Sequence, residues 1–131
     1  MDVTRLDETD AERLTGPIFE TQVHRKAGPS EEFGDHGVSM SEIFFAPGER
    51  TAMHEHTVRQ ILYVTEGEGI LASEDEKNPV SEGDIISIPP DEPHWHGAKP
   101  NATFAHLSFV ILDENGEGSF AVEEPEGRRS E

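Results

Sequence analysis

Two stretches of the chain decide its fold: GERTAMHEHTVRQILYVTEG, residues 48–67, and GDIISIPPDEPHWH, residues 83–96. Side chains alternate between the two faces of an extended strand. His54 and His56 therefore point the same way, about 7 Å apart, and His94 and His96 do the same on a later strand. Imidazole is the commonest metal ligand of proteins, and Gln60 offers an amide oxygen. The spacing permits these donors to meet at one ion.

The first stretch resembles the first sequence motif of the cupins. The pattern runs Gly48, five residues, His54, one residue, His56, three residues, Gln60, six residues, Gly67. Cupins most often have Glu where this chain has Gln60. The stretch otherwise fits the family pattern in both residue type and spacing.

The second stretch resembles the second cupin motif, with two departures. Gly83, Pro89 and His94 fit that motif, but Asp91 replaces a glycine and no asparagine follows at the usual place. The resemblance covers roughly residues 38 to 112. It implies an all-β fold, the double-stranded β-helix jelly-roll barrel. It also implies a metal site formed by four side chains: His54, His56, Gln60 and His94.

The run His94-Trp95-His96-Gly97 is similar to one subgroup of small single-domain cupins. That subgroup includes manganese-dependent hydroxynitrile lyases and cupins grouped with carboxymuconolactone decarboxylases. Three imidazoles and one amide add no negative charge, so a bound ion keeps its full charge and remains a strong Lewis acid. We expect one divalent transition metal ion, Mn or Fe first, with Zn, Ni and Co also compatible.

A single His-x-His pair is more often explained by surface or core histidines than by a metal. The presence of a second His-x-His pair makes metal binding the better explanation of both pairs. His96 follows His94 by two residues and shares its face, but it lies too far along the strand to join the same ligand set. We therefore predict that His96 is a general base for catalysis. The alternative is that His96 holds a water molecule or another ligand.

The inward positions of the predicted strands describe a small, mostly apolar cavity with a few polar groups. The predicted substrate-binding residues are Ser41, Ile43, Leu62, His106, Ser108 and Val110. The chemistry favoured is that of a metal-dependent lyase, isomerase or decarboxylase acting on a small oxygen-bearing molecule. A small-molecule-binding or sensing cupin without turnover and a cupin dioxygenase are the alternatives.

The composition limits the partners. The 131 residues suffice for one domain, and the net charge of -18 argues against nucleic acid and against an anionic membrane surface. Low hydrophobicity with high charge is also typical of disorder, but here the apolar residues cluster in strand-length runs, which is typical of a folded all-β chain.

Only three residues are Lys, against many Asp and Glu. This composition favours adaptation to concentrated salt, as in a halophilic acidic protein. An apolar outward set, Met40, Phe44 and Trp95, predicts a homodimer.

The chain contains no Cys, no apolar stretch of signal-peptide length and no run of 18 apolar residues, so we expect a cytoplasmic protein. We divide it into a polar segment (1–15) with a helical turn ending at Leu14, a barrel domain (16–122) and a mobile acidic tail (123–131). Loops are predicted at 25–37 and 74–83, and a tight turn at 67–69. Strands are predicted at 18–24, 38–45, 51–56, 60–66, 70–73, 85–88, 94–96, 104–112 and 119–122.

Overall fold

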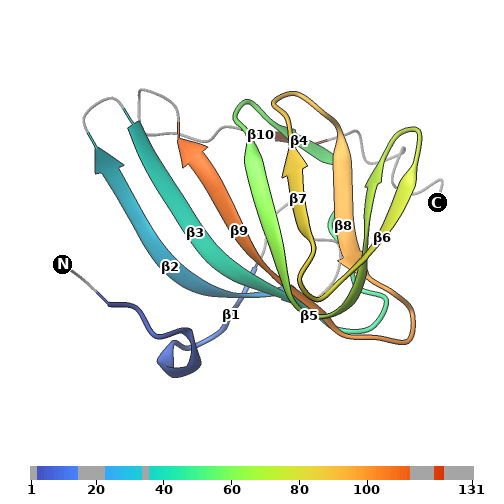
Figure 1. Ribbon diagram of the computed structural model, residues 1–131, viewed down its shortest axis with the longest axis horizontal. Helices are drawn as coiled ribbons and strands as arrows, with labels where there is room; N and C mark the ends of the chain where they lie inside the picture. Colours follow the sequence, from blue (N-terminus) through green and yellow to red (C-terminus); the bar gives the residue numbers. More distant parts are fainter. Residues whose placement is uncertain (1–2, 15–22, 34–35, 113–119, 123–131) are drawn as a thin grey trace.

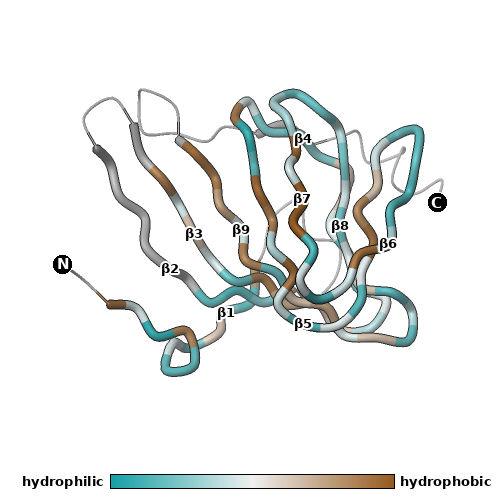
Figure 2. Tube along the Cα trace, viewed as in Figure 1, coloured by the Kyte–Doolittle hydropathy of each residue, from teal (hydrophilic) through white to brown (hydrophobic). Residues whose placement is uncertain are grey.

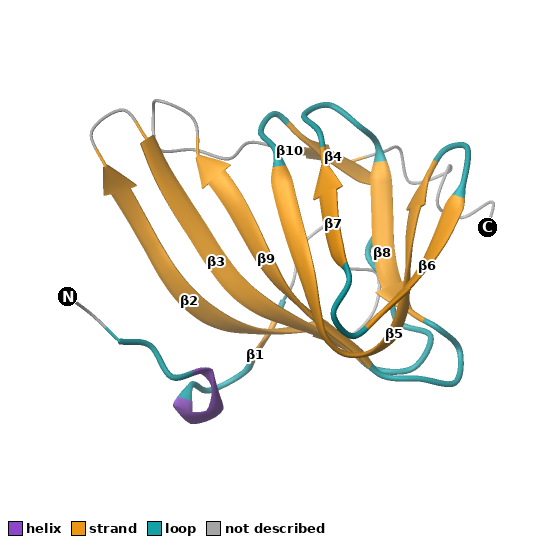
Figure 3. Cartoon of the chain, in the orientation of Figure 1, coloured by secondary structure: helices purple, strands orange, loops and turns teal. Residues whose placement is uncertain are grey.

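The structure is a computed structural model, and it describes residues 3–14, 23–33, 36–112 and 120–122 (Figure 1). The described part of the chain is strand and loop except for one short 3-10 helix, η1 (Leu6–Glu8), as Figure 3 shows. The strands are β1 (Glu12–Arg13), β2 (Val23–Phe33), β3 (His36–Phe45), β4 (His54–His56), β5 (Gln60–Ser73), β6 (Lys77–Ser81), β7 (Ile85–Ile88), β8 (His94–Ala98), β9 (Phe104–Leu112) and β10 (Phe120–Val122). The all-β prediction is confirmed.

The strands form one curled sheet in the order β1-β2-β3-β9-β5-β8-β4-β10, with β6 and β7 also paired to β5. Figure 1 shows this sheet curling into a half barrel. Strand β5 joins the two halves: its beginning pairs with β7 and β9, and its end with β6 and β8. The curled sheet agrees with the predicted jelly-roll barrel. Among the described residues, no helix has the length and apolar character needed to cross a membrane.

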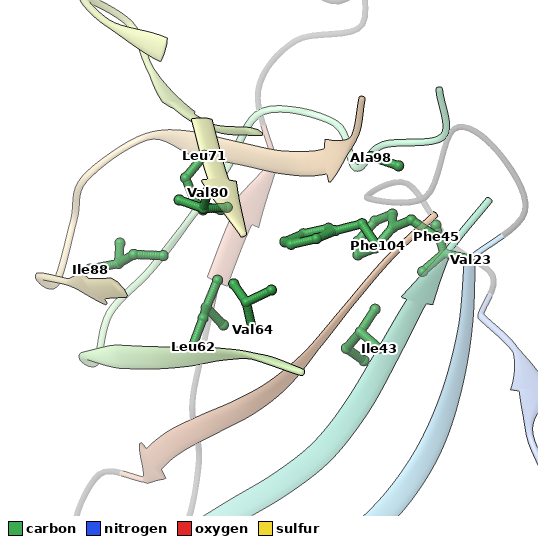
Figure 4. Close-up of a cluster of buried hydrophobic side chains, with 10 residues drawn as sticks. All are labelled: Val23, Ile43, Phe45, Leu62, Val64, Leu71, Val80, Ile88, Ala98 and Phe104. Carbon is green, nitrogen blue, oxygen red and sulfur yellow. The ribbon is translucent and has the colours of Figure 1, made fainter. Parts of the chain in front are cut away.

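The hydrophobic core is built by buried side chains from both halves of the sheet (Figure 4). Its members are Val23, Ile43, Phe45, Leu62, Val64, Leu71, Val80, Ile88, Ala98 and Phe104. Figure 2 shows hydrophobic stretches on β3, β9, β5 and β7, where much of this core originates. Burying a large aliphatic or aromatic side chain stabilises a fold by about 1.5–3 kcal/mol. The core therefore holds together the strands that present the candidate site.

The outer face of the half formed by β3, β9, β5 and β7 carries apolar side chains. Tyr63, Ile85 and Ile111 are 40%, 69% and 49% exposed. Tyr63 lies opposite Ile85 on one side and opposite Leu107 on the other, so these side chains form one strip across three strands. We call Tyr63, Ile85, Leu107 and Ile111 the outer strip.

Trp95, predicted to belong to an apolar outward set, contributes little open surface. It is only 8% exposed, because the guanidinium of Arg50 lies 4.0 Å from its ring centroid and the ammonium of Lys77 lies 5.8 Å away. The π face of an indole ring carries partial negative charge and attracts cations. Trp95 therefore packs beneath two basic side chains.

The predicted loop at 25–37 is wrong over its described residues. Strand β2 continues to Phe33 and pairs antiparallel with β3, which begins at His36. The register shifts between Ala27 and Ser30, where the sequence has Gly28-Pro29. A bulge lets a strand pass over residues that would otherwise break its ladder. Gly and Pro mark this irregularity here and not the end of the strand.

The predicted turn at 67–69 is also wrong, because β5 runs without interruption from Gln60 to Ser73. The register shifts instead between Val64 and Glu66, and Gly67 has a φ of 74°. A Cβ on Gly67 would meet the carbonyl oxygen of Thr103 at 1.8 Å. The glycine is required by a bulge and a close approach. The predicted loop at 74–83 likewise contains β6, which pairs with the end of β5.

The predicted helical turn ending at Leu14 is replaced by η1 and by β1, which pairs with β2. The side chains of Glu12 and Arg25 form an ion pair across these strands, and the Leu14 amide donates to the carbonyl of Val23. Tertiary pairing thus overrides a local helix signal. The strand predicted at 18–24 lies outside the described residues except for Val23 and His24, which belong to β2, and the predicted tail at 123–131 lies outside them entirely.

Candidate metal centre

The two histidine pairs meet because β4 and β8 are antiparallel and place His54 directly opposite His94. Along antiparallel strands, residue numbers increase in opposite directions. His56 and His96, each two residues further along its own strand, therefore lie on opposite sides of the His54–His94 pair. This register brings three of the histidines together and sets the fourth apart.

The three gathered imidazoles are those of His54, His56 and His94. One ring nitrogen of each lies within 4.8 Å of those of the other two. The ring centroids are 4.4 Å apart for His54 and His94, 5.2 Å for His54 and His56, and 5.6 Å for His56 and His94. His54 and His94 are each 2% exposed, and His56 is half-buried. This triad could hold a metal ion.

Backbone carbonyl groups fix two of these rings. The Nδ1–H of His54 donates to the carbonyl of Ala52 at 2.7 Å, and the Nδ1–H of His94 donates to that of Glu92 at 2.8 Å. Each ring then has its lone pair on Nε2, which is the arrangement that metal-binding histidines usually show. In His94 this Nε2 is buried and has no hydrogen-bond partner. A buried polar atom without a partner is costly, and a metal ion would satisfy it.

Gln60 begins β5 and is 6% exposed. Its Nε2 donates a 2.8 Å hydrogen bond to the hydroxyl of Ser108. Its buried Oε1 has no partner of ordinary hydrogen-bond geometry, but it lies close enough to His56 to raise the pKa of that imidazole. With the amide nitrogen held by Ser108, the oxygen is turned toward the triad. Gln60 thus fits the fourth ligand position that was predicted for it.

The site keeps its imidazoles neutral. Burial, together with the neighbouring His94, lowers the pKa of His54 to about 3 and that of His56 to about 4. Burial also lowers the pKa of His94. Neutral imidazoles are the form that binds metal, so the triad is in its ligating state at neutral pH. Three neutral nitrogen donors and an amide oxygen fit a divalent transition metal ion.

His96 lies beside the triad without belonging to it. Its ring centroid is 5.5 Å from that of His54 and 4.8 Å from that of His106. Its Nδ1 and Nε2 of His106 are 2.9 Å apart, a hydrogen bond between two buried rings. Burial holds the pKa of His96 well below its usual value, so this side chain is also neutral at pH 7. That His96 is a general base and not a ligand stays a prediction.

The predicted substrate-binding residues lie in several environments. Ile43 and Leu62 belong to the hydrophobic core, and Ser108 and His106 are buried and bonded to Gln60 and His96. Ser41 and Val110 are half-buried. A pocket of about 170 Å³ opens beside His94, but its wall is made by β5, β6, β7 and the start of β8 and includes none of the six predicted residues. Their role in substrate binding stays a prediction.

Sequence reasoning missed Thr51. This residue is 1% exposed; its amide donates to the carbonyl of His96 at 2.9 Å, and its Oγ1 accepts from the amide of His96 at 3.2 Å. Thr51 therefore fixes the backbone that carries His96. No local signal marked it, because the contact joins residues 45 positions apart.

The curled sheet and its histidine cluster define a class of protein, the small β-barrel with a candidate metal centre inside. The chain belongs to the cupin family: the family described as "Cupin domain" matches residues 41–110, more than half of its length. The match includes all four predicted ligands and His96.

Three relatives illustrate the range of the family. (R)-Mandelonitrile lyase of Granulicella tundricola is 40% identical over 76 residues, covering 55% of this chain and 56% of that protein. The chain thus matches little more than half the length of this relative. Gentisate 1,2-dioxygenase of a Ralstonia species is 41% identical over 67 residues, covering 50% of this chain and 19% of that protein. A solved cupin-like protein of Thermotoga maritima superposes with a TM-score of 0.76 at 26% identity, covering 99% of this chain and 96% of that one.

Proposed function

We propose that this cupin is a metal-dependent lyase that acts on a small hydroxy compound, with a cyanohydrin as the first candidate substrate. The observation that carries the proposal is the neutral imidazole of His96, held 5.5 Å from the ring of His54 but outside the triad. Such a residue is free to move a proton while the others hold an ion. The similarity to (R)-mandelonitrile lyase supports the choice of substrate class.

His54, His56, Gln60 and His94 are the residues that would hold the ion. A divalent ion bound there would supply Lewis acidity that polarises the substrate. No carboxylate belongs to this set, so the ligands leave its charge undiminished. The pocket beside His94 gives a small molecule room close to the centre.

The chain's own contribution is proton transfer. His96, neutral because it is buried, takes the proton of the substrate hydroxyl through an unprotonated ring nitrogen. The O–H electron pair becomes the second bond of the new carbonyl, and the bond to the nitrile carbon breaks with its electron pair leaving on cyanide. His96 then gives the proton to cyanide. An aldehyde and hydrogen cyanide are released, and the imidazole is restored.

A dioxygenase is the second candidate, since gentisate 1,2-dioxygenase is also a relative. The two functions differ in the metal they require, because dioxygen chemistry needs a redox-active ion such as iron. A binding or sensing cupin would use the same ligands without turnover.

The test combines metal analysis with two variants. Protein purified without added metal is analysed for its elements, reloaded with Mn, Fe or Zn, and assayed for release of benzaldehyde from mandelonitrile. His96→Ala is expected to keep its metal but lose about 100 to 10,000-fold in rate, the usual effect of removing a general base. His94→Ala is expected to lose the metal. His24→Ala, on β2, serves as the control.

Two outcomes would redirect the assignment. If His96→Ala strips the metal, His96 is a ligand and the base lies elsewhere. If wild type and His96→Ala are equally inert on cyanohydrins, on aldehydes with nitromethane and on small keto acids, while a small molecule still binds, the protein is a binding cupin.

A further inference from the structure

We propose that the pocket beside His94 binds the substituent of the substrate, and that two carboxylates at its mouth make it accept a neutral or cationic group and reject an anionic one. The inference rests on the proposed function, since it names the class of hydroxy compound that the centre takes. It departs from the sequence-based prediction, because none of the six predicted substrate-binding residues lines this pocket. The binding step can be tested without turnover.

The pocket lies where the two halves of the sheet meet, and it reaches a candidate metal ligand. Its wall includes His94 and also Ser73, which lies directly opposite His94 in the pairing of β5 with β8. The buried Nε2 of His94 has no hydrogen-bond partner within the described part of the chain. A molecule in the pocket is therefore next to a residue that would carry the ion.

The inner wall of the pocket is apolar. Leu71, Ala72 and Ile88 are only 3–4% exposed, and Ile86 packs against the hydrophobic core. The pocket volume is about 170 Å³. A cavity of about 150 Å³ lined by Leu, Ile and Phe is known to bind benzene. A phenyl ring or a short branched alkyl chain therefore matches this wall in both size and polarity.

The mouth of the pocket is negatively charged. Glu76 and Glu92 line the pocket, and both are exposed, so they lie at its open side. The carbonyl of Glu92 accepts the 2.8 Å hydrogen bond from His94, which keeps Glu92 beside this ligand. No described Lys or Arg forms an ion pair with either carboxylate. The two negative charges therefore act on whatever enters.

These charges select among substituents. With the hydroxyl of the substrate at the metal centre and its ring against the apolar wall, a group at the far end of the ring lies at the mouth. One like charge about 4 Å away in water lowers affinity by about 5-fold, so two carboxylates should lower it by about 10- to 30-fold for an anionic group. An ammonium group at the same place is attracted. Neutral and cationic hydroxy compounds are thus the substrate class.

Three matched ligands test this selection: benzyl alcohol, 4-(aminomethyl)benzyl alcohol and 4-(hydroxymethyl)benzoate. Each is titrated into Zn²⁺-loaded protein labelled with ¹³C at the isoleucine methyl groups. We expect the signals of Ile86 and Ile88 to shift and that of Ile43, one of the predicted substrate-binding residues, to stay. The ammonium compound should bind at least as tightly as benzyl alcohol, and the carboxylate compound about 10- to 30-fold more weakly than benzyl alcohol.

Charge-removing variants separate electrostatic selection from the shape of the pocket. Glu76→Gln combined with Glu92→Gln should bring the affinity for 4-(hydroxymethyl)benzoate to within about 3-fold of that for benzyl alcohol, whose own affinity should not change. Glu74→Gln is the matched control, because Glu74 is exposed in the same loop but does not line the pocket. In wild type, 1 M KCl should reduce the difference between the charged ligands, because salt screens exposed charges.

The contrary results are equally specific. Shifts at Ile43 in place of Ile86 and Ile88 would put the ligand among the predicted residues and overturn the proposal. So would the absence of binding by all three ligands, equal affinities in wild type, or a preference that the double variant leaves unchanged. If the ligands bind as expected but mandelonitrile is not cleaved, the proposed function fails while the selectivity of the pocket stands.

Discussion

Gln60 and Ser108 are joined across β5 and β9 by a 2.8 Å hydrogen bond from the amide nitrogen to the hydroxyl. The bond determines which end of the amide faces the three imidazoles. An amide that is free to rotate would present its N–H₂ to the metal position half of the time, and an N–H₂ cannot bind a cation. The serine hydroxyl thus selects oxygen as the donor.

We expect Ser108→Ala to weaken metal binding by about 10–100-fold, the usual effect of losing a partner that orients a ligand. Competition with a chelator of known affinity measures this. Ser87→Ala is the matched control, because Ser87 is exposed and accepts a hydrogen bond only from Arg59 among its described contacts. An unchanged affinity in Ser108→Ala would mean that Gln60 does not bind the ion through its oxygen.

The buried histidines make stability depend on pH. In the folded protein the pKa of His54 is about 3, and those of His56 and His106 are about 4, against 6.5 in the unfolded chain. Between those values the unfolded chain binds protons that the folded protein does not. The free energy of unfolding should therefore fall as the pH drops from 6.5 toward 4, by up to about 1.4 kcal/mol per pH unit for each such group.

Denaturant titrations of the metal-free protein at pH 7.5, 6.5, 5.5 and 4.5 check this dependence. Above pH 7 these groups are neutral in both states and should contribute nothing to the slope. A free energy of unfolding that stays constant down to pH 4.5 would contradict the burial of neutral imidazoles.

Salt should stabilise the protein. The net charge of -18 means that like charges repel one another in the folded protein. In 1 M salt the Debye length shortens to about 3 Å, which screens this repulsion. We expect the melting temperature to rise from low to multimolar KCl. A melting temperature that stays constant or falls with increasing salt would contradict salt adaptation as the reason for the acidic composition.

The outer strip should mediate a homodimer. Tyr63, Ile85 and Ile111 expose apolar surface on adjoining strands, whereas Trp95 is covered by basic side chains. Light scattering should give twice the chain mass of 14.5 kDa for wild type and the single mass for Ile85→Lys combined with Ile111→Lys. Val3→Lys, at an equally exposed apolar position, should not change the wild-type mass. A monomeric wild type would refute the dimer.

The sequence predicted the site better than the strand boundaries. Strand alternation is a local rule, and it places His54 and His56 on one face of their strand and His94 and His96 on one face of theirs. The pairing of β4 with β8, which puts His54 opposite His94 and gathers the triad, joins distant parts of the chain. The hydrogen bond between His96 and His106 and the support from Thr51 join distant parts of the chain, so no local pattern contained them.

The errors in the fold share one physical cause. The residues of β6, Lys77 to Ser81, and those of β2 beyond Arg25 are polar or include Gly and Pro, so propensity favoured loops. They are strands because β5 and β3 offer them backbone partners. Pairing is a property of the neighbouring strand and is not visible in the segment itself.

Strand β5 changes which side chains face inward at its register shift. Before the shift the even-numbered Leu62 and Val64 lie in the core, and after it the odd-numbered Leu71 does, opposite His96. The extra residue at this point thus reverses the alternation of inward and outward side chains along β5. Deleting one residue between Val64 and Gly67 would turn either the Gln60 end or the Leu71 end of the strand inside out. Over evolution, the spacing between the two motifs can therefore lengthen or shorten in the loops on either side of β6, but not within β5.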